Sequence, residues 1–173
     1  MRFLLDSMLG KLTRWLRILG YDSQYLRDAS DNHLLSQAKH ESRILLTSDT
    51  QLYRTAISRG VSCFLISTQS EPERLAHLAH RFNMNLKLNP STSRCPLCGS
   101  AIKPVKAEEI LGDVPPETIK LYKRFWTCTN RSCAKVYWHG SHWKNIEETI
   151  RSASEILERK RKHGTGDFSV PFS

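Results

Sequence analysis

Short apolar segments that end at an aspartate and lead into a helical pattern constrain the fold of this chain more than any other feature. Ile44 to Leu46 is an apolar run without polar alternation, which is the pattern of a parallel strand buried on both faces. It ends at Thr47-Ser48-Asp49, and a helical pattern follows from Gln51. Residues 2–5 repeat the plan, with Asp6 at the end of the run. Carboxylates that follow neighbouring strands are expected to lie close together at the carboxyl end of the sheet.

This strand-helix pair occurs four times in the first half of the chain. The expected strands are 2–5, 22–26, 44–46 and 61–66, and the expected helices are 7–19, one opening at Asp31, one from 51 to about 60, and one from 72 to about 83. Such alternation predicts an α/β fold with a parallel sheet and helices on its faces. Because right-handed crossovers place every strand-to-helix loop at one sheet edge, Asp6, Asp31 and Asp49 are expected to converge there.

Each of these aspartates has two interpretations. Asp is favoured at helix N-termini, where it accepts backbone N–H bonds and stabilises the helix by about 0.5–2 kcal/mol. For one aspartate taken alone, this capping role is the better interpretation. Three carboxylates at one edge favour a different role, because clustered carboxylates repel one another unless they share a proton or a hard cation.

The first expected helix has an apolar face and a basic face. Its apolar side chains recur every three or four residues: Met8, Leu12, Trp15 and Leu19. Lys11, Arg14 and Arg17 step along the opposite side, which by itself is typical of a solvated helix face. The position of Lys11 and Arg14 shortly after Asp6 places them within reach of anything bound at that aspartate.

Four of the five cysteines form two pairs, Cys95/Cys98 and Cys128/Cys133. In an intracellular chain, C-x₂-C and C-x₄-C pairs favour a metal site over disulfides. Expected strands at 102–106, 125–127 and 136–138 complete the outline of a zinc ribbon. Four cysteine ligands leave no open position for a water molecule, so this zinc is predicted to be structural. A redox dithiol, or a mixed site with His139 or His142, is the alternative.

Charge and composition indicate the kind of partner. The net charge of +9 favours a polyanion, which means RNA, with a ribosome or another ribonucleoprotein as a further candidate; a merely soluble basic protein is the alternative. No apolar run approaches the roughly 18 residues of a membrane span, and the N-terminus turns acidic at Asp6, unlike a secretory signal. We therefore expect a cytoplasmic protein without a membrane partner. The sequence does not predict an oligomeric state.

The polar connector around Asn89-Pro90 is the expected domain boundary. It predicts a first domain at 1–88, a ribbon at 93–143, a basic amphipathic helix at 144–164 and a disordered tail at 165–173. The cations at 159–162 either complement the C-terminus of that helix or contact phosphates. The aromatic run from Tyr137 to Trp143 suits stacking on single-stranded bases or packing of the ribbon against the first domain. The sequence favours neither role over the other.

Specific motifs connect these features to a known family. Residues 3–12 (FLLDSMLGKL), with 15–17 (WLR) and 20–22 (GYD), resemble the opening of the Mut-seven C-terminal RNase domain, a branch of the PIN-like nucleases. The segment from Asp31 to Ala38 is similar to the second acidic segment of that family, and residues 43–49 are similar to the third. The resemblance continues through the cysteine-rich half. It implies a PIN-like sheet flanked by helices, then a zinc ribbon and a C-terminal helix.

The resemblance also implies a reaction. Asp6, Asp31 and Asp49 would hold one or two Mg²⁺ or Mn²⁺ ions that activate water for endonucleolytic hydrolysis of RNA, and Lys11, Arg14 and Arg17 would contact phosphates. Asp28 is an alternative second acid, and the fourth acid of many PIN nucleases has no clear counterpart. A non-catalytic RNA- or ribosome-binding adaptor is the alternative function. A toxin-like nuclease neutralised by a partner is a third.

Overall fold

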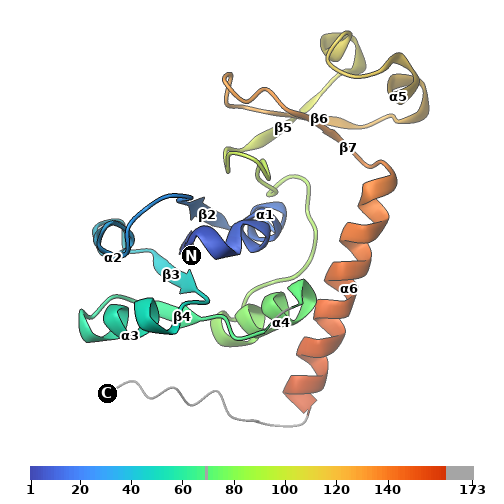
Figure 1. The fold of residues 1–173 in the computed structure, drawn as a ribbon. Coiled ribbons are helices and arrows are strands. Elements are labelled where there is room, and N and C mark those ends of the chain that lie inside the picture. Colours follow the sequence, from blue (N-terminus) through green and yellow to red (C-terminus); the bar gives the residue numbers. More distant parts are fainter. Residues whose placement is uncertain (69, 163–173) are drawn as a thin grey trace. The chain divides into compact units, whose positions relative to one another are not determined.

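The computed structural model describes residues 1–68 and 70–162 (Figure 1). Residues 1–67 and 88–141 form one compact unit, and the remaining described residues form a second. Each unit is thus built from two separate stretches of the chain. The predicted domains at 1–88, 93–143 and 144–164 are instead each one continuous stretch. The ribbon groups with the first three helices because its cysteine knuckle packs against the first of them. The predicted disordered tail at 165–173 lies outside the described residues.

A parallel four-stranded sheet forms the centre of the first unit. Its strands are β1 (Arg2–Leu5), β2 (Asp22–Tyr25), β3 (Ile44–Thr47) and β4 (Cys63–Leu65), in the order β2-β1-β3-β4. Leu5 of β1 is paired with Leu46 of β3. The predicted α/β class and parallel sheet are therefore confirmed, and the two strands that end in aspartate are neighbours.

Helices cover both faces of this sheet. After β1 come a 3-10 turn η1 (Ser7–Leu9) and α1 (Gly10–Ile18); α2 (Asp31–His40) joins β2 to β3, and α3 (Thr50–Ser58) joins β3 to β4. Helices α2 and α3 share one core with the sheet, made of Leu4, Leu34, Leu35, Ala38, Leu45, Leu52, Ala56 and Val61. The chain moves from β1 to β2 in one direction and then returns past β1 to β3. Right-handed crossovers therefore place α1 on the opposite face.

The start of the first helix differs from the sequence prediction. Met8 was expected on the buried face, but its side chain is 67% exposed, while Leu9 is fully buried. The first turn is a 3-10 turn, which has 3.0 residues per turn instead of 3.6 and so shifts the phase of the side chains that follow Asp6. The prediction for Met8 was therefore wrong, whereas Leu12 and Leu19 are buried as expected.

Arg43 connects the strands of the sheet at their amino ends, opposite the ends that carry the aspartates. Its guanidinium donates to the carboxylate of Asp22 at 2.8 Å, to the carboxylate of Glu41 at 2.6 Å and to the carbonyl of Phe3 at 3.2 Å. Burial opposes ionisation of Asp22, but the hydrogen bond and charge of Arg43 outweigh it, so the pKa of Asp22 is lowered. This ion pair connects the starts of β1, β2 and β3.

The predicted ribbon is present in the first unit. Its antiparallel strands β5 (Ile102–Val105), β6 (Phe125–Cys128) and β7 (Val136–Trp138) agree with the three predicted strands within a residue. Between β5 and β6 the chain forms a 3-10 turn η2 (Ala107–Ile110) and a short helix α5 (Pro116–Leu121). The buried core here consists of Ile110, Val114 and Phe125. A core this small leaves much of the stability of the ribbon to a metal.

The second unit contains α4 (Glu71–Phe82) and, apart from its first residue, α6 (Ser141–Lys162). Ser70 caps α4 by accepting the N–H of Glu73, and Asn83 ends it in the left-handed conformation. Helix α6 begins three residues before the predicted start at 144, and its basic run at 159–162 occupies the last turn as expected. Within residues 1–68 and 70–162, every helix is too short or too polar to cross a membrane.

Candidate functional site

The strand order reverses between β1 and β3, and one aspartate follows each of these strands. In open α/β sheets, ligands bind outside the carboxyl ends of the strands at such a reversal point. Asp6 follows Leu5, and Asp49 lies two residues beyond the end of β3 at Thr47. The topology therefore singles out Asp6 and Asp49 as the carboxylates at the place where this fold binds ligands.

Asp6 is held in a fixed position. Its side chain is only 4% exposed, and its Oδ1 accepts the N–H of Met8 at 2.9 Å. Its Oδ2 accepts a hydrogen bond from the hydroxyl of Thr47, which is fully buried. The Thr47 oxygen in turn accepts the backbone N–H of Asp49 at 2.9 Å. The Thr47 hydroxyl thus connects the two strand ends that carry the aspartates.

Asp49 is exposed and caps α3. Its Oδ1 accepts the N–H groups of Gln51 at 2.6 Å and Leu52 at 3.0 Å. Both bonds use one oxygen, so the capping role and a second interaction through Oδ2 are compatible. The two interpretations of Asp49 from the sequence therefore do not exclude each other.

Asp31 is placed differently. It is the exposed first residue of α2, and the cap of that helix is Ser30, whose hydroxyl accepts the N–H of His33 at 3.4 Å. Asp28 is also exposed, in the loop before α2. In the described part of the chain, the four cysteines are the one group of three or more His, Cys, Asp or Glu side chains close enough to share an ion. The structure thus brings Asp6 and Asp49 to adjacent strand ends, but it does not gather Asp31 or Asp28 with them.

The basic stripe of α1 divides into two environments. Lys11 and Arg14 are exposed, as expected for phosphate contacts. Arg17 is only 8% exposed, and its guanidinium donates to the backbone carbonyls of Ser23, Pro96 and Leu97. Arg17 is therefore enclosed by β2 and the cysteine knuckle instead of facing solvent beside Lys11 and Arg14.

The four cysteines lie together at the end of the ribbon. Their sulfur atoms are within 4.8 Å of one another, with Sγ–Sγ distances of 3.7 Å for Cys95–Cys133 and 3.4 Å for Cys98–Cys128. A tetrahedral zinc with Zn–S bonds of about 2.3 Å needs sulfurs about 3.8 Å apart, whereas a disulfide needs about 2 Å. The residues present therefore fit a four-cysteine zinc site.

The cysteines of the cluster differ in how readily they ionise. Burial opposes ionisation of Cys98, but hydrogen bonds with Ser100 and the neighbouring cysteines outweigh it and lower the pKa of Cys98 to about 6. Burial raises the pKa of Cys128 to about 12, so a metal must displace its proton. The hydroxyl of Tyr137 lies 3.0 Å from Sγ of Cys95 and can donate to a thiolate there. The unpaired Cys63 has a pKa raised to about 12 by burial, as expected for an inert thiol.

The sequence model of one protein family, described as the Mut7-C RNAse domain, matches residues 1–150. The chain belongs to the Mut7-C RNAse domain family. The match covers the whole sheet, both aspartate-bearing strand ends and the cysteine cluster, and it confirms the resemblance found in the sequence. No curated protein and no solved structure matches this chain significantly. The family name indicates a nuclease-like function and RNA as the substrate.

Two residues at the candidate site were not identified from the sequence. The sequence pattern marks Thr47 only as the end of a strand. A hydroxyl in a strand buried on both faces needs a hydrogen-bond partner, however, and that requirement is the signal that points to Thr47. Ser48 has a buried hydroxyl without a hydrogen-bond partner among the described residues. It lies between Thr47 and Asp49, so this unsatisfied polar atom is located at the candidate site.

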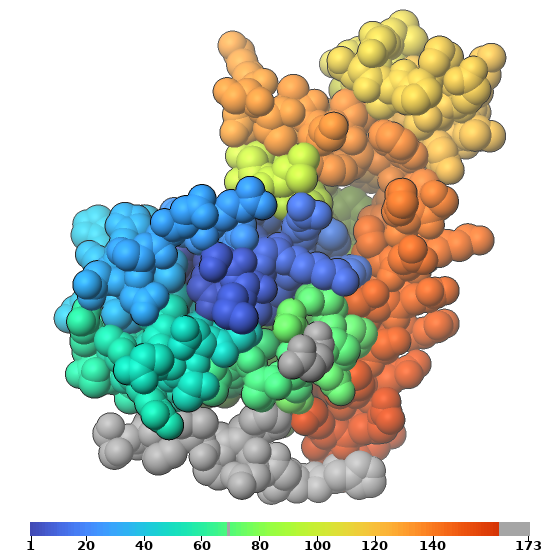
Figure 2. Space-filling model, in the orientation of Figure 1, coloured from blue at the N-terminus to red at the C-terminus, as the bar shows by residue number. Residues whose placement is uncertain are grey.

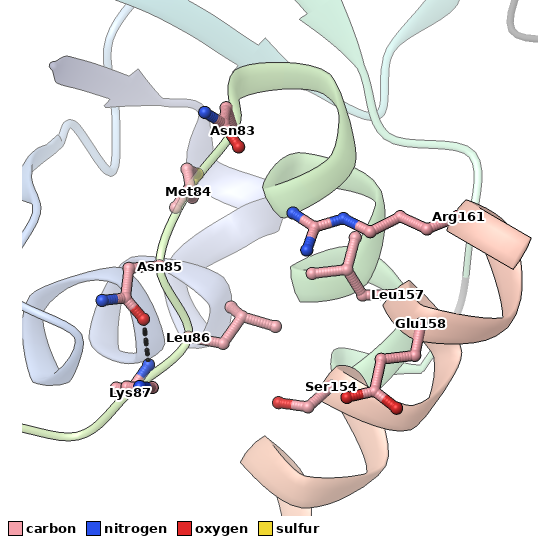
Figure 3. Close-up of a pocket in the computed structure, with 9 residues that line it drawn as sticks. All are labelled: Asn83, Met84, Asn85, Leu86, Lys87, Ser154, Leu157, Glu158 and Arg161. Carbon is pink, nitrogen blue, oxygen red and sulfur yellow. Dashed lines mark hydrogen bonds between the residues drawn. The ribbon is translucent and has the colours of Figure 1, made fainter.

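A separate hollow of about 340 Å³ lies within the second unit of the Mut7-C chain (Figure 3). Its buried lining is Met84, Leu86 and Leu157, and polar side chains surround it: Asn83, Asn85, Lys87, Ser154, Glu158 and Arg161. The segment at one side is braced by Asn85, whose Oδ1 accepts the N–H of Lys87 at 2.8 Å. With one carboxylate in its lining, this hollow lacks the clustered acids that hydrolysis with a hard cation requires.

Proposed function

We propose that this Mut7-C domain is a metal-dependent endoribonuclease whose Mg²⁺ or Mn²⁺ site lies at the carboxyl ends of β1 and β3. The observation that carries the proposal is the hydrogen-bonded link from Asp6 through Thr47 to the backbone of Asp49. It holds two carboxylate-bearing strand ends in a fixed relation at the reversal point of the sheet. The partnerless hydroxyl of Ser48 at the same place further supports a bound group there.

The roles of the side chains follow from their environments. Asp6, fixed by Met8 and Thr47, is the rigid ligand, and the lone pairs not used by those two donors remain for a cation. Asp49 contributes its second oxygen while its first continues to cap α3. Asp31, or Asp28 in its place, contacts the metal through water from the exposed start of α2. The bound metal supplies water activation and stabilises charge on the phosphate oxygens.

RNA is the proposed substrate, because a basic chain from an RNAse family requires a polyanion that carries a scissile phosphate. Lys11 and Arg14 are exposed on α1, which begins immediately after the 3-10 turn capped by Asp6. We assign Lys11 to the reacting phosphate and Arg14 to a neighbouring one. Arg17 has no such role in this proposal, because its donors are used by buried carbonyl groups.

The test is metal-dependent RNA cleavage by the Asp49→Asn variant. Asn also caps helices, so folding should be retained, but a neutral amide is a poor ligand for a hard cation and cleavage should be almost completely lost. Asp113→Asn is the matched control, because Asp113 is an exposed acid of the ribbon that is far from β1 and β3 in the sequence. Unchanged cleavage by Asp49→Asn would remove Asp49 from the site.

A non-catalytic RNA- or ribosome-binding adaptor is the second candidate. The observation that favours it is that Asp6, Asp31 and Asp49 do not form a group close enough to share one ion in the described structure. An adaptor would bind RNA through the same basic surface but would leave it intact with any divalent cation. If the protein is an adaptor, the wild type and the Asp49→Asn variant should bind RNA with equal affinity.

A further inference from the structure

Arg17 lies in an unusual place for an arginine. It occupies the last turn of α1 and is 8% exposed. Its Nε donates to the carbonyl of Ser23 at 3.0 Å, and its Nη1 donates to the carbonyls of Pro96 at 3.0 Å and Leu97 at 2.7 Å. Pro96 and Leu97 are the two residues between the metal-binding Cys95 and Cys98, so this one side chain connects α1, β2 and the cysteine knuckle.

The approach of the knuckle to Arg17 is close. Gly99 follows Cys98 with a φ of +80°, and a Cβ at Gly99 would lie 3.1 Å from Nε of Arg17. Backbone bonds fasten the same segment to the end of α1: the N–H of Arg94 donates to the carbonyl of Arg17 at 2.8 Å. Figure 2 shows the knuckle segment, in yellow-green, between the blue N-terminal segment and the orange strands of the ribbon.

The hydrogen bonds of Arg17 do not neutralise its charge. Carbonyl groups are neutral, and a buried guanidinium needs a compensating negative charge. Arg43 and Arg74 form ion pairs with carboxylates, whereas the contacts of Arg17 among the described residues are to carbonyl groups. Burial lowers the pKa of Arg17, and the negative groups that oppose this are first Cys98 and Cys95 and only then Asp22, which is already paired with Arg43.

The zinc site that fits the four cysteines supplies the missing charge. A divalent cation held by four thiolates has a net charge of about −2, and the knuckle that contacts Arg17 provides two of those ligands. Groups that hydrogen-bond to the ligand-bearing backbone, or balance the charge of the ligands, fix ligand orientation and tune metal affinity. Arg17 hydrogen-bonds to that backbone, and Tyr137 at Sγ of Cys95 contributes a further donor.

We propose that Arg17 is a positioning residue that acts as the counter-ion of the four-cysteine zinc site and transmits its occupancy to helix α1. With zinc bound, the dianionic centre and the knuckle carbonyls hold the guanidinium and order the last turn of α1. Without zinc, the knuckle is no longer fixed by the metal, its carbonyls hold the guanidinium less firmly, and the end of α1 loosens. The proposal does not depend on the proposed ribonuclease activity, because zinc affinity and helix order are measured without RNA.

The experiment uses the zinc-loaded full chain as wild type, Arg17→Lys and Arg17→Met. The control variant is Arg54→Met, because Arg54 is exposed on α3. Zinc affinity is measured by competition with a chromophoric chelator. Arg17→Met should bind zinc about 10 to 100 times more weakly, in the range for lost outer partners of a metal site. Arg17→Lys should be intermediate, because it keeps the charge but not the planar fork of donors. Arg54→Met should match wild type, and wild-type affinity in Arg17→Met would overturn the proposal.

A second measurement needs no variant and remains informative if Arg17→Met fails to fold. Amide hydrogen exchange of the wild-type chain is followed before and after zinc is removed by a chelator. The amides of residues 14–19, at the end of α1, should exchange at least about tenfold faster without zinc, while those of α3 should change little. Equal protection of α1 with and without zinc would show that Arg17 does not couple zinc binding to the order of α1. Loss of protection throughout the whole sheet would show general unfolding and would equally contradict a coupling localised at α1.

Discussion

The hydroxyl of Thr47 donates a hydrogen bond to Oδ2 of Asp6, and the Thr47 hydroxyl oxygen accepts the N–H of Asp49 at 2.9 Å. One buried side chain therefore sets the distance between the strand ends that carry the two candidate ligands. A carboxylate held in this way loses little freedom when it binds a cation. Thr47 thus has a role in the proposed site that is distinct from direct contact with the metal.

Replacing Thr47 with valine tests this role, because the two side chains have nearly the same shape. Thr47→Val should weaken Mn²⁺ binding by about 10 to 100 times, as expected when an outer partner of a ligand is lost. It should also lower the free energy of unfolding by about 1–3 kcal/mol, since a buried acceptor of Asp6 loses its donor. Titration calorimetry and urea unfolding measure the two effects.

The control for that variant is Thr55→Val. The hydroxyl of Thr55 donates to a carbonyl within α3. It removes a similar hydrogen bond at a place that the proposed site does not use. Mn²⁺ affinity should then be unchanged. If Thr47→Val binds Mn²⁺ as tightly as wild type does, the link between the strand ends is structural only.

The ion pair of Asp22 and Arg43 makes part of the stability depend on pH. The pKa of Asp22 is lowered in the folded state, so its contribution is present above the ordinary Asp pKa of about 3.9 and is lost as the pH falls through the lower folded value. Asp22→Asn should therefore be less stable than wild type at neutral pH, with the difference disappearing in acid. Unfolding by urea at a series of pH values measures it, and a difference that is constant with pH would contradict the assignment.

One zinc ion per chain is expected, bound by the four cysteines. Cys128→Ser should lose the zinc and unfold the ribbon, because the core of Ile110, Val114 and Phe125 is small. Cys63→Ser is the matched control: Cys63 packs against the sheet core away from the cluster, so this variant should retain the metal. Metal analysis and circular dichroism provide the measurements, and equal zinc content in both variants would be incompatible with the four-cysteine site.

Acid should release the zinc, because the thiolates must take up protons when the metal leaves. Burial raises the pKa of Cys128 to about 12, so this thiolate takes up a proton readily once the metal leaves. The apparent zinc affinity should therefore fall steadily as the pH is lowered from 8 to about 5. A chelator competition at several pH values checks this, and a pH-independent affinity would show that the ligands are not thiolates.

RNA binding through Lys11 should follow counter-ion release. The logarithm of affinity should fall linearly with the logarithm of salt concentration, with a slope near −0.7 for each phosphate contact on single strands. Lys11→Ala should make the slope shallower by about one contact and should slow cleavage more than it weakens binding. Lys39→Ala, an exposed lysine of α2, is the control. Neutralising the run at 159–162 should weaken binding without changing the cleavage rate of bound RNA.

Several features could be predicted from the sequence because local patterns encode them. The apolar runs that end at Asp6 and Asp49 predicted two parallel strands, and the spacing of the cysteines predicted a ribbon with four clustered cysteines. That β3 is adjacent to β1 could not be known, because strand order depends on how the helices between the strands pack. The sequence alone therefore did not show that the strands ending in these two aspartates are neighbours.

Arg17 shows why the remaining features could not be predicted. Helical periodicity places it on the same side as Lys11 and Arg14, but periodicity cannot say what covers that side. The cover is a segment 79 positions away in the chain, which reaches Arg17 because the knuckle docks on the end of α1. The environment of Asp31 could not be predicted for a similar reason: Ser30 takes the cap position of α2, and Asp31 remains exposed in the first turn.

The most direct test of the central claim is single-turnover cleavage of a circular RNA by the zinc-loaded protein, with Mg²⁺ or Mn²⁺ added or omitted. A circle has no ends, so only an endonuclease can open it. The account predicts linear fragments when Mg²⁺ or Mn²⁺ is present, none when both are omitted, and none with Asp49→Asn at any metal concentration. A circle that the wild-type protein binds but leaves intact with both metals would contradict the account and indicate an RNA-binding adaptor.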